Sequence, residues 1–286
     1  MGYNKMIKEQ EWIVEAERVS YTYEGNDRKA LDGFSLKIRQ GEKVAFMGAN
    51  GSGKSTFFLC MNGILRPDEG RILLKGAPIE YTRKGLLSAR QKVGIVFQEP
   101  DDQLFSASVY QEISFGILNL GVSEEEARRE VEQVIEELGI TPFRDRPVHG
   151  LSGGQKKQVA IADILVMHPD VLILDEPAAA LDPKHTKKVR DVMDRLTEKG
   201  ITVLMSTHDI DHAYEWADTI VLVHEGRVLK AGPPEQICLD EKALEETNLE
   251  MPAVLRLFRS LVKKGLVKEE ERPPRNMEEL ERRLAV

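Results

Sequence analysis

The chain has few cysteines and no long apolar run, and both facts restrict the kinds of protein that it can be. Cys60 and Cys238 are its only cysteines, which provides neither a disulfide framework nor a cysteine metal site and fits a reducing compartment. Cys60 lies in an apolar run and is expected in the core. No run approaches the ~18 apolar residues of a membrane-spanning helix, and Met1–Met6 has no signal-peptide core. We expect that any work at a membrane requires docking to another protein.

A basic surface is also absent. Lys and Arg number 40 against 48 Asp and Glu, and the formal net charge of −8 argues against a general nucleic-acid binder. A single small anion needs only local positive potential, so this net charge does not exclude an anionic ligand. With 41% apolar and 31% charged residues, the 286-residue chain can bury a sizeable core beneath a hydrated surface.

Short apolar segments alternate with amphipathic ones. Strand-like patterns cover residues 12–23, 30–39, 43–47, 71–75, 93–97, 171–174 and 201–206, with a hairpin over 219–230. Helices are expected from about Lys54 and over 123–138, 155–167 and 184–198. This order predicts an α/β fold with a mostly parallel core sheet and an antiparallel N-terminal portion. From about residue 246 the sequence is rich in charged residues and has a helical pattern. We therefore expect a main domain over 12–245 and a helical extension over 246–286.

A glycine-rich loop stands between the strand 43–47 and the following helix. Its residues are Gly48, Ala49, Asn50, Gly51, Ser52, Gly53, Lys54, Ser55 and Thr56. This is the P-loop pattern, in which backbone N–H groups and the helix N-terminus bind phosphate. Lys54 would reach the β- and γ-phosphates, and the Ser55 hydroxyl would ligate Mg²⁺. A chance glycine-rich turn is the alternative, but the strand before it and the helix after it favour the P-loop.

Two carboxylates follow the apolar strand 171–174. Asp175 is expected to hold Mg²⁺ at the carboxyl end of that strand, where ligands collect in open α/β sheets. Glu176 is expected to act as the general base toward the attacking water. Alone, such a pair is often only a strand end. In a chain with a P-loop, the catalytic interpretation is favoured.

A second glycine-rich turn precedes the helix 155–167. It contains Ser152, Gly153, Gly154 and Gln155, and its hydroxyl and amides form another anion-binding helix start. A P-loop, this turn and the Asp-Glu pair, in this order, resemble the ATP-binding-cassette (ABC) ATPases. In that family the turn closes on the γ-phosphate held by the P-loop of a second subunit. The resemblance therefore implies a P-loop NTPase fold of ABC type with a helical subdomain, and a dimer with two shared sites.

The same resemblance assigns roles to four other residues. It implies that Gln98 contacts Mg²⁺ and reports the nucleotide state to a partner, and that Asp182 lies across the subunit interface. His208 matches the histidine that contacts the γ-phosphate. Tyr23 matches the aromatic that stacks on adenine, although Tyr21 lies on the same face of its strand.

Two details depart from the family or imitate another. The family commonly has Thr after Asp-Glu-Pro, but residues 178–180 are all Ala, so a hydroxyl is missing near the interface loop. Every group with a direct catalytic role is present, so we still expect hydrolysis of ATP with Mg²⁺.

His208 and His212 imitate half of a zinc-protease helix, but Asp209 stands where the general-base Glu is needed. We expect no zinc site, and His212 on a helix surface.

Within this family the chain resembles the ATPases of energy-coupling-factor (ECF) importers, particularly the cobalt/nickel group. The residues that carry this resemblance are 99–105, 114–116, 119–121, 155–157, 159–162 and 232–235. It implies two ATPase subunits on the cytoplasmic face of the cell membrane, as a homodimer or with a paralogue, beneath a transmembrane coupling protein that binds a substrate-capturing membrane protein. Residues 101–105 would help to line the groove for the coupling protein. No nucleic-acid partner is expected.

Several alternatives stay open at this point. The cargo could be a vitamin rather than cobalt or nickel ions, because no residue of an ATPase subunit would bind it. The chain could instead be a soluble ABC ATPase, or a module that closes on ATP without turnover, although the intact Glu176 and His208 disfavour the latter. Leu255, Leu257, Phe258 and Leu261 predict a C-terminal helix that either supports the dimer or forms a small packed appendage.

Overall fold

The computed structural model describes residues 11–179, 181–268 and 272–284. The expectations for Met1–Met6 and for Ala180 therefore concern residues outside the described part of the chain. Within that part, no helix is both long enough and apolar enough to span a bilayer.

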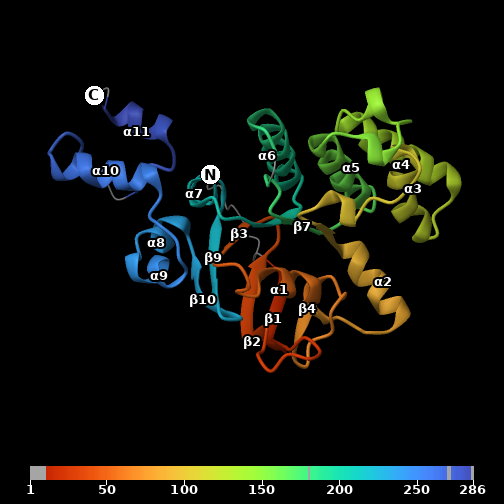
Figure 1. The fold of residues 1–286 in the computed structure, drawn as a ribbon, viewed down its shortest axis with the longest axis horizontal. Coiled ribbons are helices and arrows are strands. Elements are labelled where there is room, and N and C mark those ends of the chain that lie inside the picture. The colour runs from red at the N-terminus through yellow and green to blue at the C-terminus, as the bar shows by residue number, and fades with distance from the viewer. Residues whose placement is uncertain (1–10, 180, 269–271, 285–286) are drawn as a thin grey trace, which may run out of the picture.

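A six-stranded sheet forms the centre of the molecule (Figure 1). Five neighbouring strands run parallel, and the sixth pairs antiparallel with the fifth to close the predicted hairpin. Along the sheet the strands are β6 (Val93–Val96), β7 (Val171–Asp175), β8 (Thr202–Ser206), β3 (Lys43–Met47), β9 (Thr219–His224) and β10 (Arg227–Gly232). The parallel direction brings the carboxyl ends of β3, β7 and β8 to one edge, and this edge carries the site.

A separate antiparallel sheet comes mainly from the N-terminal part of the chain. Its strands, in spatial order, are β2 (Leu31–Arg39), β1 (Trp12–Tyr21), β4 (Glu69–Leu74) and β5 (Ala77–Pro78). The strands expected over 12–23, 30–39 and 71–75 are thus present, with ends shifted by a few residues at most. The α/β fold with a mostly parallel core and an antiparallel N-terminal portion is confirmed.

The central sheet is buried on both faces, which explains its continuous apolar strands. In β3, Ala45 and Met47 belong to the core on the helical side, whereas Val44 and Phe46 belong to the core shared with the antiparallel sheet. Helix α1 (Lys54–Met61) fills this second core with aromatic contacts: the ring centroids of Phe34 and Phe57 are 4.3 Å apart. Cys60 is fully buried there, as expected.

A helical subdomain lies at one end of the sheet, at the right of Figure 1. It contains α3 (Val109–Asn119), α4 (Glu124–Glu137) and α5 (Gly153–Leu165), and short 3-10 turns occur at Pro100–Asp102, Thr141–Phe143 and Val148–Gly150. Helix α4 matches the expectation, and Ser123 caps it by accepting the N–H of Glu126. Helices α2 (Arg83–Lys92), α3 and α7 (Ile210–Trp216) were not predicted, whereas α6 (Pro183–Glu198) was.

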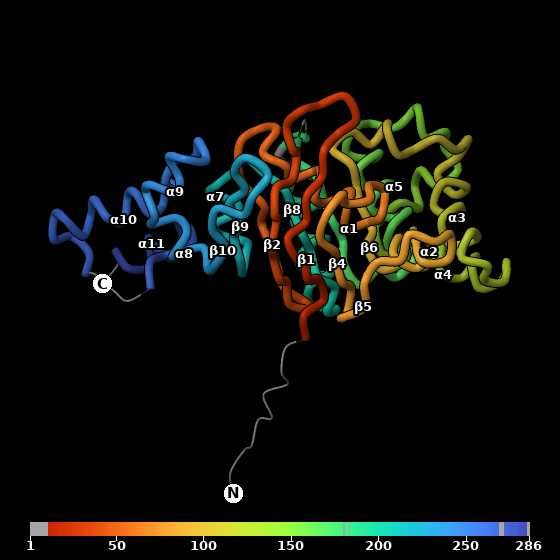
Figure 2. The backbone as a smooth tube through the Cα atoms, turned by 90° about the horizontal axis from the view of Figure 1, so that it is seen from below, coloured from red at the N-terminus to blue at the C-terminus, as the bar shows by residue number. Residues whose placement is uncertain are grey.

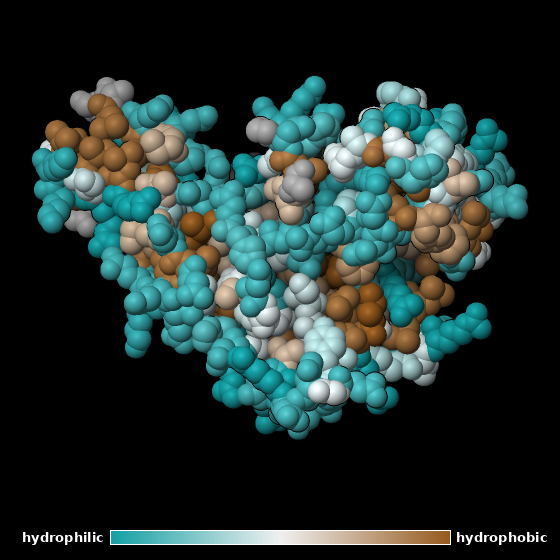
Figure 3. All heavy atoms as spheres, viewed as in Figure 1, coloured by the Kyte–Doolittle hydropathy of each residue, from teal (hydrophilic) through white to brown (hydrophobic). Residues whose placement is uncertain are grey.

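The C-terminal helices lie at the opposite end of the molecule (Figures 1 and 2). They are α8 (Pro234–Cys238), α9 (Glu241–Glu246), α10 (Ala253–Lys263) and α11 (Met277–Leu284). Leu255, Phe258 and Leu280 are buried in the core cluster that also includes the helical face of the central sheet. Leu257, Leu266 and Met277 remain exposed, and apolar surface covers this end in the space-filling view (Figure 3).

Candidate active site

The P-loop has the backbone shape that phosphate binding requires. Gly48 and Gly53 have φ values of 141° and 111°, in a region that disfavours other residues. A Cβ on Gly48 would stand 2.1 Å from the carbonyl oxygen of Val223, and one on Gly53 would stand 2.7 Å from that of Ala30. Strand β3 and helix α1 anchor the two ends of the loop. These positions therefore need glycine for both conformation and space.

The Lys54 ammonium lies inside this loop. Its Nζ donates to the carbonyl oxygens of Gly48 at 2.8 Å and Ala49 at 3.1 Å. Burial lowers the pKa of Lys54, and the carboxylates of Glu176 and Asp175 oppose that shift. The P-loop and the two strand-end carboxylates are therefore parts of one electrostatic site.

A single hydroxyl joins the two carboxylate residues. Ser206, at the end of β8, donates from Oγ to Asp175, and the same Oγ accepts the backbone N–H of Glu176 at 2.9 Å. On its other oxygen, Asp175 accepts a hydrogen bond of 2.7 Å from the Ser55 hydroxyl. The pairing of β7 with β8 sets this geometry, because Asp175 and Ser206 are register partners. Sequence analysis missed Ser206, although a Ser at the carboxyl end of an apolar strand was a usable signal.

Glu176 has an unusual backbone and a half-buried carboxyl group. Its φ of 46° is left-handed, which is rare for a residue with a long side chain and typical of functional sites. The pKa of its carboxyl group lies above the usual value, mainly because of burial. The charge of Asp175 adds to this rise, and the neighbouring His208 partly opposes it. Oε1 lies 3.2 Å from Nε2 of His208 but accepts no hydrogen bond from any described residue. A buried acceptor beside a histidine can receive a proton from a water placed between the P-loop and Glu176.

The residues around Asp175 fit Mg²⁺ held together with a nucleotide. A hydroxyl and a carboxylate oxygen are the hard donors that Mg²⁺ prefers, and phosphate oxygens and water complete its octahedron in such sites. Ser55 and Asp175 already lie within hydrogen-bond distance of each other. In the described part of the chain no cluster of three or more His, Cys, Asp or Glu could hold a metal by itself. The His208–His212 pair forms no such cluster.

Gln98 and Tyr23 approach the site from two other elements. Gln98 follows β6 at the same edge of the sheet, and its side chain is exposed. The backbone carbonyl oxygen of Gln98 accepts a 2.8 Å hydrogen bond from Nζ of Lys157. The Tyr23 hydroxyl lies 3.2 Å from Oγ1 of Thr56 in α1. Tyr21 instead packs against the core with its ring 5.0 Å from that of Tyr23. Tyr23 is therefore the more accessible aromatic beside the P-loop.

The second glycine-rich turn, residues 151–155, is named here the signature turn. Ser152 and Gln155 form a capping box: Gln155 N–H donates to Ser152 Oγ, and Gln155 Oε1 accepts the N–H of Ser152 at 3.1 Å. Ser152 and Gly153 are exposed. In the described part of the chain no hydrogen bond joins this turn to the P-loop. The capping box uses the N–H groups of Ser152 and Gln155, so the Ser152 hydroxyl and the N–H groups of Gly153 and Gly154 are the donors that this helix start can still offer.

The signature turn and Asp182 meet at the start of α6. The His185 ring lies against Gly154, where an added Cβ would stand 2.2 Å from Cδ2 of that ring. Nδ1 of His185 lies 2.7 Å from Oδ2 of Asp182, which caps α6 by accepting the N–H of His185 at 2.9 Å. These contacts hold the pKa of Asp182 below its usual value. His185, also missed from the sequence, connects two predicted interface elements.

The expectation that His212 lies on a helix surface was wrong. It is only 6% exposed and faces Trp216 with ring centroids 6.2 Å apart. The next turn of α7 and the neighbouring α6 cover it, which a pattern confined to one short helix could not reveal. Desolvation, reinforced by Arg190, lowers its pKa to about 4.

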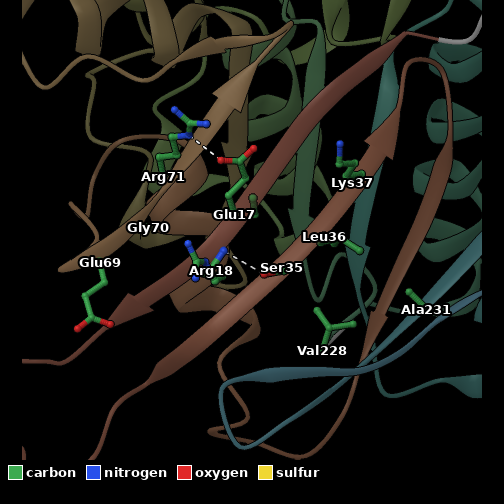
Figure 4. Close-up of a pocket in the computed structure, with 11 residues that line it drawn as sticks. Glu17, Arg18, Ser35, Leu36, Lys37, Glu69, Gly70, Arg71, Val228 and Ala231 are labelled. Atoms are coloured by element: carbon green, nitrogen blue, oxygen red, sulfur yellow. Dashed lines mark hydrogen bonds and ion pairs between the residues drawn. The ribbon is translucent and has the colours of Figure 1, made fainter.

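A different hollow lies on the antiparallel sheet (Figure 4). Most of its charged side chains have partners: Nε of Arg71 donates to Glu17 at 2.6 Å, and Nζ of Lys37 lies 2.6 Å from Oε2 of Glu15. None of the predicted site residues lines it. The hollow is therefore separate from the edge where the P-loop and the carboxylates meet.

Comparison with known proteins agrees with this geometry. The sequence model of the "ABC transporter" family matches residues 31–179. A model described as "osmosensitive K+ channel His kinase sensor domain" matches residues 111–251, which excludes the P-loop. The energy-coupling factor transporter ATP-binding protein EcfA of Methanocaldococcus jannaschii is 43% identical over 253 residues, covering 88% of this chain and 90% of that protein.

Two solved structures extend the comparison. CbiO1 of Clostridium perfringens, described as part of the ABC transporter complex cbiONQ, has a TM-score of 0.74 and 43% identity, and the match covers 87% of this chain and 100% of that one. The ATP-binding cassette MJ0796, a dimer in a post-hydrolysis state with ADP and Pi, has a TM-score of 0.70 and 28% identity over 77% of this chain and 98% of that one. This chain therefore belongs to the ABC transporter family of ATPases, and within it to the ATP-binding proteins of energy-coupling factor transporters.

Proposed function

We propose that this chain is the ATP-hydrolysing motor of an ECF importer, bound peripherally at the cytoplasmic face of the cell membrane. The observation that carries the proposal is the meeting of Lys54, Ser55, Asp175 and Glu176 at one sheet edge, while the signature turn stands apart on α5 with its donors free of the P-loop. Such a chain has two half-sites and no complete one. A second subunit would complete both.

The chemistry assigned to the residues follows from their positions. The P-loop amides of residues 48–56 and Lys54 would bind the phosphates of ATP, and Tyr23 would stack on adenine. Mg²⁺, held by Ser55, Asp175 and Gln98, would neutralise charge on the phosphates. Glu176 would accept a proton as water attacks the γ-phosphorus, and the bond to the β-phosphate oxygen would break to release ADP and phosphate.

The remaining site residues would act between subunits or beside the γ-phosphate. His208 would donate a hydrogen bond to the γ-phosphate from its place beside Glu176. Ser152, Gly153, Gly154 and Gln155 would present donors to the γ-phosphate bound by the partner, and Asp182 would lie across the interface. The dimeric cassette MJ0796 supports this arrangement by likeness. A homodimer is our first choice, since both half-sites of this chain keep their reactive groups.

The helical subdomain offers a surface for a membrane partner. The rings of Phe105 and Phe115 form an exposed edge-to-face pair 5.0 Å apart, with 67% and 49% of each residue accessible. The buried carboxylate of Glu112 holds the chain there by accepting the N–H groups of Phe105 at 3.0 Å and Ser106 at 2.5 Å. Exposed aromatic pairs of this kind are typical of docking sites. Residues 101–105 would therefore help to line the groove for the coupling protein.

For the cargo, we propose cobalt or nickel ions, with a vitamin as the alternative. The residues after Gln98, which resemble those of the cobalt/nickel group, support the metal cargo. We further propose a division into an ATPase domain over 12–245 and an extension over 246–286. In that extension the buried Leu255 and Phe258 would anchor α10, and the exposed Leu257 would face the second subunit.

The experiment that tests this function is purification of the tagged chain from native membranes in mild detergent, followed by mass spectrometry. A tagged Phe105→Ala/Phe115→Ala variant serves as the matched control. We expect the wild-type chain to recover a coupling membrane protein and a small substrate-binding membrane protein, whose identity indicates the cargo, and the variant to recover less of both. An active ATPase that recovers no membrane protein would contradict the transport function and favour a soluble ABC ATPase.

A further inference from the structure

One face of α5 is fastened to the segment that carries Gln98. This segment, residues 97–103, is named here the glutamine segment. Nζ of Lys157 donates to the carbonyl oxygens of Phe97 at 3.0 Å and Gln98 at 2.8 Å. One turn later, Nε2 of Gln103 donates to the carbonyl oxygen of Ala160 at 3.0 Å. The same Nε2 donates to Asp163 at 3.1 Å.

A further contact lies at the surface, where Nζ of Lys156 is 2.6 Å from Oδ1 of Asp101. Positions 156, 157, 160 and 163 lie at helical spacing, so they share one side of α5. The glutamine segment is therefore attached along two turns of the helix that begins with the signature turn.

Lys157 differs from the other attachments because it is buried. Only 1% of the residue is exposed, and its hydrogen bonds go to backbone carbonyl oxygens beyond the end of β6. These carbonyl groups have left the sheet ladder and need a donor. An apolar side chain would fill the same space without supplying one. A buried ammonium is costly to desolvate, which makes a role beyond packing worth testing.

The Gln98 side chain has no such fixation of its own. It is exposed and forms no hydrogen bond with another residue in the described part of the chain. Its direction is therefore set by the peptide that carries it, and Lys157 holds that peptide. The hydrogen bonds from Lys157 thus tie the Gln98 backbone to α5.

We infer that Lys157 is a positioning residue for Gln98, which couples the orientation of the signature helix α5 to the amide at the Mg²⁺ site of the same chain. This inference rests on the proposed function, in which Gln98 contacts Mg²⁺. Lys157 is almost fully buried, and the hydrogen bonds recorded for its Nζ both go to backbone carbonyl oxygens. It acts through the carbonyl groups of residues 97 and 98, and so it should affect turnover only while Gln98 is present.

The test is a double-mutant cycle in the full-length chain with Lys157→Met, Gln98→Ala and the double variant. The measured quantities are kcat, the Mg²⁺ concentration at half-maximal rate and ATP affinity without Mg²⁺. We expect Lys157→Met to lower kcat by about tenfold or more, because a misplaced site group costs rate. ATP affinity without Mg²⁺ should stay within about twofold. The double variant should be no slower than Gln98→Ala.

Lys156→Met is the matched control, because it cuts only the exposed contact to Asp101 and should keep a wild-type kcat. Should Lys157→Met not fold, Lys157→Arg enters the same cycle, with thermal unfolding as the check. A wild-type kcat in the Lys157 variant, or losses that multiply in the double variant, would overturn the inference alone. If Gln98→Ala itself hydrolyses ATP like wild type at every Mg²⁺ concentration, the proposed role of Gln98 fails first.

Discussion

The imidazole of His185 occupies the space that a side chain on Gly154 would need. An added Cβ would stand 2.2 Å from Cδ2 and 2.5 Å from Cγ of that ring. The ring cannot move freely, because its Nδ1 is held 2.7 Å from Asp182. The glycine of the signature turn is thus explained by a neighbour within the same chain, in addition to any role of its amide toward a nucleotide.

Gly154→Ala should therefore uncouple nucleotide binding from hydrolysis. The new methyl group would push His185 away from Asp182 and shift the turn, while the P-loop stays intact. We expect ATP affinity of the monomer within about twofold of wild type and a steady-state rate lower by about tenfold or more. The matched control is Gly150→Ala, where a Cβ meets nothing within 4 Å. Wild-type turnover by Gly154→Ala would refute the steric argument.

Glu176→Gln should bind ATP, hydrolyse it poorly and accumulate as a closed dimer. The amide keeps the size of the side chain but cannot accept the proton from water. Size-exclusion chromatography with ATP and a phosphate-release assay measure the two effects together. Glu17→Gln, on the antiparallel sheet, is the control and should remain active. If Glu176→Gln turned over ATP at the wild-type rate, the general-base assignment would be wrong.

Ser206→Ala should lower the rate of hydrolysis strongly while the protein remains folded. It removes the donor to Asp175 and the acceptor for the Glu176 N–H, so both carboxylates lose their alignment. We expect a kcat lower by about tenfold and a loss of about 1–3 kcal/mol in unfolding free energy. Ser20→Ala is the control, since that buried hydroxyl accepts the Gly33 N–H in the other sheet. We expect Ser20→Ala to lose a comparable amount of stability and to keep full activity. If Ser206→Ala also kept the wild-type kcat, Ser206 would have no role in the site.

His212 should make the fold sensitive to acid. Desolvation lowers its pKa from 6.5 to about 4, so between these pH values the unfolded chain binds a proton that the folded chain does not. Stability therefore falls as pH drops from about 6.5 toward 4, by about 2 kcal/mol at pH 5 from this group. Urea unfolding at pH 7.5 and 5.0 should show that extra loss in wild type and not in His212→Gln. The exposed His149→Gln should behave as wild type; equal pH dependence in all three chains would contradict the prediction.

The sequence predicted the strands of the core better than the helices around them. Apolar runs such as residues 171–174 indicate strands directly, and Ser123 with Glu126 marks the start of α4. Helix α3 was missed although Val109, Ile113 and Ile117 are its buried stripe, because one narrow stripe in a mixed segment is a weak signal. Helix α2 buries only Ala89, so few of its residues mark a face turned to the core.

The residues of the site also fall into those that the sequence could predict and those that it could not. Lys54, Ser55, Asp175 and Glu176 could be predicted because each stands in a local pattern at a strand end or loop. Ser206 was harder to predict: its place at the end of an apolar strand is a signal, but its contacts with Asp175 and Glu176 depend on the register of β8 against β7, which no local pattern encodes. Contacts such as His185 with Gly154 join segments that are distant in sequence, and only the tertiary structure brings them together.

The left-handed backbone of Glu176 implies a trade-off between stability and activity at one position. A Glu at φ 46° costs on the order of 1 kcal/mol relative to a residue without a Cβ. Glu176→Gly would relieve that strain and remove a half-buried carboxyl group, so we expect a protein that melts at a higher temperature and has lost hydrolysis. Selection for thermal stability alone would thus favour an inactive chain.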